Sequence, residues 1–392
     1  MRLSHFAYAD TLRVVAIVAV VCCHVLFIGS GGAYSELAGQ LGGWGVDCFF
    51  VLSGYLLGRS YLEALMGLRS MPSIKLFWIR RFFRIWPLYA VAIIVSAGMK
   101  AIHGVHSVSI YDVLAHLLFL QNFVPAYESA IWNQPLWTMA IDAQFYALLP
   151  LLAVVIYPLC MRLQGSARNS AIGSILVVSL VLTLAWRFIS LTYVESHHLD
   201  ADTTKAQASI LLDNVLGMGS IFIVGIGLAF VEKLAKRPPN RLLGYTVFAL
   251  GLLVYPVFHL AFRGLTAGIA EGFAGAISAA MLLWGASAAK NTVFAQFSNS
   301  RALITGATLA YAIYLFHDPI NFAIFSTLTS HHVTGPVRML LLGILTFTVT
   351  TAVGYVAHRF VEKPALDAKE RAREISDSAT LVSSPKPVKA LG

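Results

Sequence analysis

Charged side chains are scarce in this chain of 392 residues. Asp, Glu, Lys and Arg together make up 12% of it, whereas 58% of the residues are hydrophobic. A soluble globular domain carries about 25% charged residues and cannot bury so large an apolar fraction. The lack of charge therefore excludes an ordinary water-soluble fold and favours a polytopic membrane protein.

Cysteine is scarce as well. The four cysteines, Cys22, Cys23, Cys48 and Cys160, lie in or beside apolar segments. Their placement excludes a disulfide framework, and a buried cysteine usually behaves as a small hydrophobic residue. The sequence also lacks a His, Cys and carboxylate set with the spacing of a metal site, so we expect no metal ion.

Long apolar segments, in contrast, are abundant. Because a helix needs about 20 mostly apolar residues to cross a bilayer, we predict an all-α bundle of ten transmembrane helices. Their approximate bounds are 11–30, 41–58, 82–102, 136–158, 172–193, 210–231, 242–260, 266–288, 302–325 and 337–358. The segment Tyr111–Phe119 is too short to span and is predicted to be an interfacial helix.

The distribution of basic residues predicts the orientation of the bundle. With a cytoplasmic N-terminus, all but five of the 28 Lys and Arg residues fall on the cytoplasmic side. The exceptions are Lys100, Arg187, Lys205, Arg263 and Arg338. Since Lys and Arg collect in cytoplasmic loops, both termini are predicted to be cytoplasmic, and the net charge of +9 needs no nucleic-acid partner to explain it.

The chain is predicted to contain one membrane domain, residues 1–366. From residue 367 to residue 392 the sequence turns polar and reads as a disordered cytoplasmic tail. The first apolar run lacks a small-residue cleavage site, so we interpret it as a membrane span and not as a secretion signal.

Several ionisable residues lie inside the predicted spans, where their cost makes them functional candidates. Arg13 and His24 are eleven residues apart, which places them on one helix face about 16 Å apart. Counting from the predicted outer ends, Asp47, Asp142 and His317 fall near the depth of His24. Because a histidine beside a carboxylate can act as a general base, these four residues form a candidate catalytic layer.

Each of these residues also has a purely structural interpretation. His24 or His317 can simply hydrogen-bond to a neighbouring helix, and Asp47 can cap a glycine-rich helix end. Arg187 is better explained as a snorkelling or paired side chain than as a catalytic one.

A basic cluster stands at the cytoplasmic mouth of the third span, with Arg80, Arg81 and Arg84 in the segment KLFWIRRFFRIWP. Guanidinium groups bind phosphate bidentately, so the cluster suits a polyphosphorylated ligand. The alternative is a cytoplasmic charge bias that contacts anionic lipid.

Six ordered features of the sequence resemble those of one family. They are the Arg13-x10-His24 spacing, GVDCFFVLSG (45–54), RRFFRIWPLY (80–89), WTMAIDAQFYALLP (137–150), YAIYLFHDP (311–319) and RFVEKP (359–364). Together they resemble the motifs of the membrane acyltransferase-3 family, integral membrane O-acyltransferases of bacterial glycans. The likeness runs over about residues 5–366. One position departs from it, because Asp142 stands where the family usually has glutamate.

The resemblance implies a multi-pass protein of the bacterial cytoplasmic (inner) membrane that moves an acyl group, most often acetyl, from cytoplasmic acyl-CoA to a glycan hydroxyl outside the cytoplasm. A separate extracytoplasmic acyltransferase is a possible partner. On this interpretation Arg13, Arg80, Arg81 and Arg84 lie along the path of the donor. The acyl chain, acetyl or a larger group such as succinyl, stays open.

The expected chemistry centres on His24, as general base or as transient acyl acceptor, with Asp142 orienting or charging it. Ser53, Tyr311 and Tyr314 are candidate donors of hydrogen bonds to a developing oxyanion. Two alternatives stay open: a non-enzymatic transporter or flippase of a lipid-linked glycan, and an acyltransferase that acts on a cytoplasmic small molecule.

Overall fold

The computed structural model describes residues 4–102, 108–124, 133–197, 210–262, 265–289 and 292–367. Within these ranges the chain is helical and contains no strand, which confirms the predicted all-α fold. The helices are α1 (Ser4–Gly29), α2 (Ser35–Leu65), α3 (Ile74–Ile102), α4 (Ile110–Leu117), η1 (Gln121–Phe123), α6 (Leu136–Arg162), α7 (Gly165–Ser196), α9 (Gly219–Ala235), α10 (Arg241–Ala261), α11 (Leu265–Ala286), α12 (Val293–Ser298), α13 (Arg301–Ser330), α14 (Gly335–Ala357) and the π-helical turn η2 (His358–Glu362). The predicted disordered tail lies, except for Asp367, outside the described residues.

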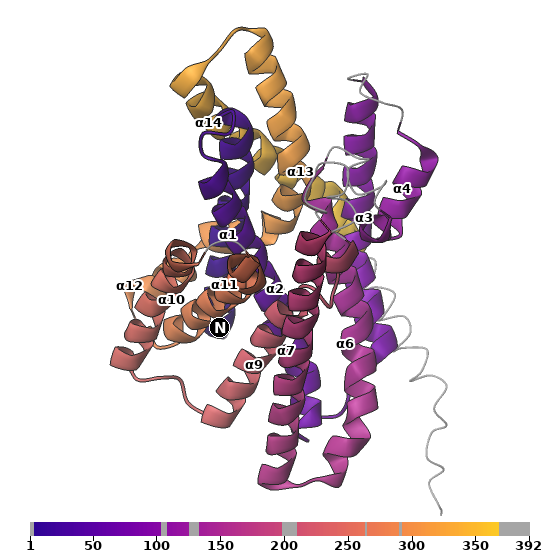
Figure 1. The fold of residues 1–392 in the computed structure, drawn as a ribbon, viewed down its shortest axis with the longest axis vertical. Helices are drawn as coiled ribbons and strands as arrows, with labels where there is room; N and C mark the ends of the chain where they lie inside the picture. The colour runs from indigo at the N-terminus through magenta and orange to yellow at the C-terminus, as the bar shows by residue number, and fades with distance from the viewer. Residues whose placement is uncertain are drawn as a thin grey trace, which may run out of the picture.

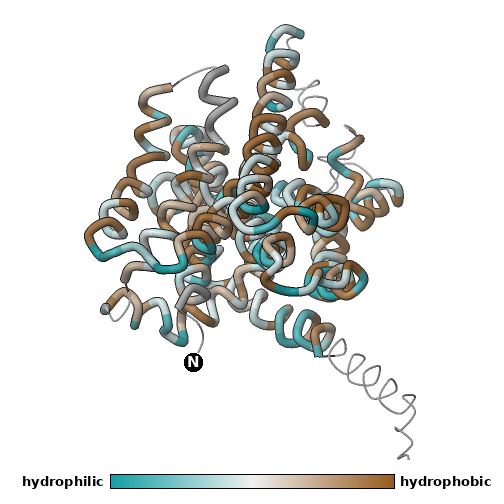
Figure 2. Tube along the Cα trace, turned by 90° about the horizontal axis from the view of Figure 1, so that it is seen from below, coloured by the Kyte–Doolittle hydropathy of each residue, from teal (hydrophilic) through white to brown (hydrophobic). Residues whose placement is uncertain are grey.

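A helix occupies each of the ten predicted spans, and seven of these helices are both long and apolar enough to cross a membrane. They are α1, α2, α3, α6, α7, α10 and α14. Helix α9 has only 17 residues, and the polar residues His317, Asp318 and Asn321 interrupt α13. The total of ten spans and the cytoplasmic position of both termini stay predictions. Figure 2 shows hydrophobic residues running along the helices and hydrophilic ones gathering toward their ends and connections.

Two boundaries differ from the sequence-based expectation. Helix α9 begins at Gly219 and not near residue 210, because the Asn214 side chain accepts hydrogen bonds from the backbone N–H groups of Leu216 and Gly217 and so forms a turn. Helix α3 begins at Ile74, eight residues earlier than predicted, so the arginine cluster lies on the helix itself. The short segment predicted at the interface is α4, whose backbone carbonyl at His116 accepts a hydrogen bond from the Tyr89 hydroxyl of α3.

Helix α2 lies at the centre of the bundle and packs closely against α9 through glycine. A Cβ atom at Gly54 would lie 2.1 Å from the carbonyl oxygen of Phe222, and one at Gly225 would lie 2.2 Å from that of Val51. Small residues let membrane helices approach to this distance. Next to this contact, the rings of Phe222 and Phe145 stack with their centroids 4.1 Å apart.

Helix α1 joins this half of the bundle to α13 and α14. It packs against α2 on one side and against α13 and α14 on the other, where Figure 1 shows the three helices together. The apolar core is accordingly divided into two clusters, one centred on α2, α6 and α9 and one on α1, α3 and α13. Because α1 contributes to both clusters, its polar residues lie between the two halves.

We expect Gly225→Ala to destabilise the fold, whereas Gly227→Ala in the same helix does not. The added Cβ at Gly225 overlaps the α2 backbone, while a Cβ at Gly227 meets no atom within 4 Å. Overpacking of this kind costs about 1–3 kcal/mol, and the gain in helix propensity is shared by both variants. Thermal unfolding in detergent tests this, and equal melting temperatures for the two variants would contradict the close α2–α9 contact.

Candidate functional site

A cavity of about 320 Å³ contains His24 and is here named the His24 cavity. Its walls come from α1, α2, α6, α7, α11 and α13 and from the segments that lead into α6 and α9. The lining residues are Val20, Cys23, His24, Gly39, Gly42, Gly43, Val46, Asp47, Gln134, Pro135, Trp137, Arg187, Met218, Gly272 and Tyr314. Asp47 is 5% exposed and packs against the glycine face of α11, where a Cβ at Gly275 would overlap its carboxylate.

The imidazole of His24 is held by a backbone carbonyl and by a second histidine. Its Nδ1 lies 2.9 Å from the carbonyl oxygen of Val20 and 3.3 Å from Nε2 of His317. The two rings meet edge to face, with their centroids 4.8 Å apart. A histidine, and not the expected carboxylate, is therefore the side-chain partner of His24.

The hydrogen bonds define the tautomers of both rings. Nδ1 of His317 lies 2.8 Å from the carbonyl oxygen of Tyr314, and a carbonyl oxygen only accepts, so each Nδ1 must carry a proton. Nε2 of His317 is then an unprotonated acceptor for the Nδ1–H of His24. In the neutral ring, Nε2 of His24 carries the lone pair, and within the described part of the chain it makes no hydrogen bond. This nitrogen has the electronic form that a general base requires.

The backbone around His24 is tied to α13 and α14 by a second set of bonds. The Asn321 side-chain amide donates to the carbonyl oxygen of His24 at 3.0 Å and accepts from the Thr346 hydroxyl at 3.1 Å. Asn321, Thr346 and His317 are all fully buried. Since buried, satisfied polar networks hold a single geometry, the imidazole of His24 is fixed in place.

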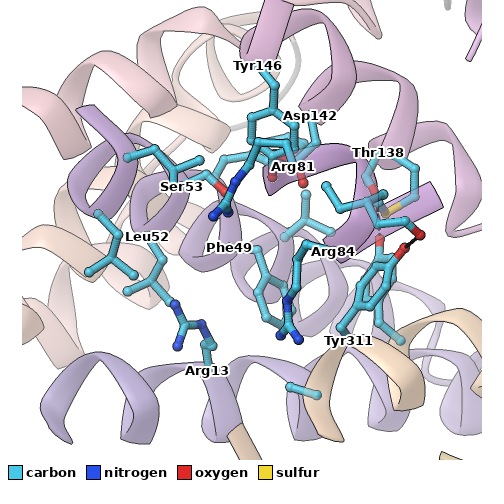
Figure 3. A pocket seen from close by; sticks show the side chains of 18 of the residues that line it. Arg13, Phe49, Leu52, Ser53, Arg81, Arg84, Thr138, Asp142, Tyr146 and Tyr311 are labelled. Atoms are coloured by element: carbon cyan, nitrogen blue, oxygen red, sulfur yellow. Dashed lines mark hydrogen bonds between the residues drawn. The ribbon is translucent and has the colours of Figure 1, made fainter. Parts of the chain in front are cut away.

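A second cavity, of about 230 Å³, contains three arginines and is here named the arginine cavity (Figure 3). Arg13 comes from α1, and Arg81 and Arg84 come from α3. The other polar lining residues are Ser53, Thr138, Asp142, Tyr146, Tyr311 and Tyr314. Arg80, which the sequence analysis grouped with Arg81 and Arg84, does not line this cavity; one residue along a helix turns its side chain by about 100°.

Two of the three guanidinium groups form ion pairs with carboxylates. Arg13 forms an ion pair with Asp10 at 2.7 Å. Arg84 pairs with Glu362 of η2, which is 1% exposed and also bonds Nδ1 of His358 at 2.8 Å. The Nε atom of Arg81 is buried and makes no hydrogen bond to any described residue. The cavity therefore contains three cations, two of which are held by ion pairs.

Asp142 lies in the arginine cavity and not beside His24. Its neighbours are the hydroxyls of Ser53 and Tyr146 and the guanidinium of Arg81, as Figure 3 shows. The structure therefore does not form the His24–Asp142 pair that the sequence suggested. The single catalytic layer divides in two, with Asp47 and His317 on the His24 side and Asp142 and Ser53 on the arginine side.

Tyr314 and Val46 separate the two cavities, because each of them lines both. The hydroxyl of Tyr314 lies 2.7 Å from the Thr138 hydroxyl and 3.2 Å from the carbonyl oxygen of Pro135. The ring of Tyr314 contacts Phe49 edge to face and lies 5.8 Å from the ring of His317. Tyr311, one turn away, donates instead to the carbonyl oxygen of Ile85 at 2.8 Å and lines only the arginine cavity.

Sequence reasoning missed four residues of this arrangement: Thr138, Tyr146, Trp137 and Asn321. The first three lie in the WTMAIDAQFY stretch, so the family motif indicated them, but the sequence analysis named only Asp142 of this stretch as a candidate site residue. Asn321 follows His317 by four residues on α13 and therefore shares its face. Arg187, interpreted as a snorkelling or paired residue, lines the His24 cavity and also donates to the carbonyl oxygen of Gly217 at 3.3 Å.

Comparison with known proteins places the chain in a family. The family model described as "Acyltransferase domain" (acyltransferase-3) matches residues 6–357. The chain therefore belongs to the membrane acyltransferase-3 family, as its motifs predicted. No solved structure gives a significant match.

Two of the three curated relatives described here are similar over most of the chain. A Staphylococcus aureus (strain COL) protein named "Putative O-acetyltransferase" is 25% identical over 93% of this chain and 58% of its own length. The Bacillus subtilis (strain 168) "Putative peptidoglycan O-acetyltransferase YrhL" is 24% identical over 91% of this chain and 54% of its own. "Peptidoglycan O-acetyltransferase OatA" of Listeria monocytogenes is 31% identical over 37% of this chain and 24% of its own length. The chain thus spans little more than half the length of the first two.

We expect diethyl pyrocarbonate to modify His24 in the folded protein and to spare His317. His24 is part-exposed and lines its cavity, and its Nε2 makes no hydrogen bond to the described chain, whereas His317 is 0% exposed. Peptide mass spectrometry measures both sites, with the exposed His197 as a positive control for the reagent. Equal modification of His24 and His317 would contradict the assigned roles of the two rings.

Proposed function

We propose that the chain is an acyl-CoA-dependent O-acyltransferase of the bacterial inner membrane that acylates a hydroxyl of an extracytoplasmic glycan. One observation carries the proposal: two cavities of different chemistry, one lined by arginines and one lined by the imidazole of His24, share the side chains of Val46 and Tyr314 as a wall. A donor and an acceptor that enter separately need such an arrangement.

The arginine cavity suits the donor. Acyl-CoA carries several phosphate groups, and fixed guanidinium groups bind phosphate with charge-assisted, bidentate hydrogen bonds. In this proposal Arg81 and Arg84 bind the phosphates, and Arg13 lies along the pantetheine path toward the thioester. The buried Nε of Arg81, without a protein partner among the described residues, is available to such a ligand.

In the proposed reaction Nε2 of His24 accepts the proton of the acceptor hydroxyl as its oxygen attacks the thioester carbonyl. The C–S bond then breaks, and the CoA sulfur leaves with the proton from the imidazolium. The Nε2 lone pair of His317 accepts the Nδ1–H of His24 and stabilises the imidazolium between these steps. In a second version His24 carries the acyl group transiently before the acceptor takes it.

The other polar residues receive roles according to their cavity. In this proposal Tyr314, on the shared wall, donates a hydrogen bond to the oxyanion once its hydroxyl no longer donates to the carbonyl oxygen of Pro135. Asp142 and Ser53 belong to the donor side, where the carboxylate offsets the charge of Arg81. Asp47 belongs to the acceptor side together with Arg187.

The acceptor is proposed from the names of the relatives, two of which refer to peptidoglycan. A glycan such as peptidoglycan would reach the His24 cavity from outside the cytoplasm, either directly or through a separate extracytoplasmic acyltransferase. Acetyl is the proposed acyl group, because the relatives are named for O-acetyl transfer.

We expect His24→Ala to lower acyl transfer by about a thousandfold, since general-base catalysis contributes a factor of this order. Membranes incubated with labelled acetyl-CoA and glycan measure the transfer. Cys22→Ala is the matched control, because Cys22 precedes His24 by two positions on α1 and lines neither cavity. Normal labelling by His24→Ala would refute the role of His24, and unlabelled glycan with the wild-type chain would favour a transporter.

We expect Arg81→Gln combined with Arg84→Gln to weaken acyl-CoA binding by about 10- to 100-fold, because each variant removes a charge-assisted hydrogen bond. Titration of the purified protein with a non-hydrolysable acyl-CoA analogue measures the change. Arg80→Gln removes a neighbouring charge outside the cavity and should leave the affinity almost unchanged. Equal affinity for all three proteins would assign the cluster to lipid contact.

A further inference from the structure

An apolar groove lies apart from both cavities of the proposed reaction. Helices α6 and α7 form its walls, and α2 and α9 form its floor. Its volume is about 310 Å³, and it shares no lining residue with the His24 cavity or the arginine cavity. We name it the α6–α7 groove; Leu62, Leu152, Ile156, Leu176 and Ile226 are representative lining residues.

The groove is open toward the surrounding hydrocarbon. Leu152 of α6 and Leu182 of α7 line it and are 54% and 65% exposed, respectively. Neighbouring residues of the same helices, such as Val155 and Val178, are exposed as well. The part of a ligand that fills the groove must therefore be apolar, and the ligand must enter from the bilayer.

The length of the groove matches one lipid chain. It runs along α6 from Phe145 to Ile156 and along α7 from Ile172 to Thr183, which is about 16 Å in each helix. One leaflet contributes about 15 Å, half of the hydrocarbon thickness of a bilayer. The stacked rings of Phe145 and Phe222 close the groove at one end.

A polar group marks the opposite end. Tyr61 lines the groove one turn before Leu65 and is 1% exposed, yet its hydroxyl makes no hydrogen bond to any described part of the protein. A buried hydroxyl without a partner is costly. The ester carbonyl of a glycerolipid is a hydrogen-bond acceptor, and it lies between the acyl chain and the headgroup.

Basic side chains lie just beyond that end, where α6 turns into α7. Arg168 donates to the carbonyl oxygens of Cys160, Leu163 and Met66 and so ties α6, α7 and the end of α2 together. Arg162, six residues after Ile156 on α6, is exposed and pairs with no carboxylate of the described chain. Neither guanidinium is neutralised by an acidic partner, so this end of the groove favours an anionic headgroup.

We propose that the α6–α7 groove binds an anionic glycerophospholipid from the leaflet on the side of the α6–α7 turn. One acyl chain fills the groove, an ester carbonyl accepts the Tyr61 hydroxyl, and the phosphate lies at Arg162 and Arg168. The lipid takes the place of packing between α6 and α7 and supports the helix pair on α9.

The test measures lipids that stay bound to the purified chain. Protein reconstituted in an equal mixture of phosphatidylglycerol and phosphatidylcholine is extracted in mild detergent and analysed by native mass spectrometry. We expect the wild-type chain to retain phosphatidylglycerol in preference. Arg162→Gln should lower that preference about fivefold, and Tyr61→Phe should lower retention of both lipids about fivefold.

Matched controls are Arg241→Gln and Tyr245→Phe, which change exposed residues of α10 away from the groove. Both should retain lipid as the wild-type chain does. Retention that is unchanged in Arg162→Gln and Tyr61→Phe would overturn the proposal. So would a wild-type chain that retains no lipid, or one that retains from cell membranes only lipids without a glycerol backbone, such as polyprenyl phosphates. Acyl transfer does not enter the measurement.

Discussion

A polar group inside the hydrocarbon layer needs a partner within the protein, and the contact between His24 and His317 meets this need for two imidazoles at once. Each ring gives its Nδ1 proton to a carbonyl of its own helix, and Nε2 of His317 accepts from His24. The only ring nitrogen of the pair left without a hydrogen bond to the described chain is Nε2 of His24. The tautomer of the proposed base is thus a consequence of how α1 packs against α13.

The position of α1 also explains why Arg13 and His24 occur on one helix face. The helix lies between the two halves of the bundle. Arg13 and His24 are about 16 Å apart along it, and Arg13 lines the arginine cavity while His24 lines the His24 cavity. The arginines of one cavity and the imidazole of the other therefore lie on opposite sides of the wall that contains Tyr314.

The sequence predicted those parts of the arrangement that depend on one helix. The shared face of Arg13 and His24, the arginine pair at i and i+3, and the apolar lengths of the helices all follow from helical geometry. Asp142 was misplaced because its depth was counted from the helix end, whereas its cavity is decided by the rotation of α6 and by Tyr314 and Thr138 between the cavities. The start of α9 was missed because a single side chain, Asn214, decides it locally.

The central claim is that donor and acceptor use separate cavities, which share the wall formed by Val46 and Tyr314, with His24 on the acceptor side. Proteoliposomes with a uniformly oriented chain test it most directly, with labelled acyl-CoA confined to the compartment that the arginine cavity faces and an acceptor glycan confined to the other. The account predicts labelled glycan in the opposite compartment while acyl-CoA itself does not cross. Transfer that occurs only when donor and acceptor share one compartment would contradict it.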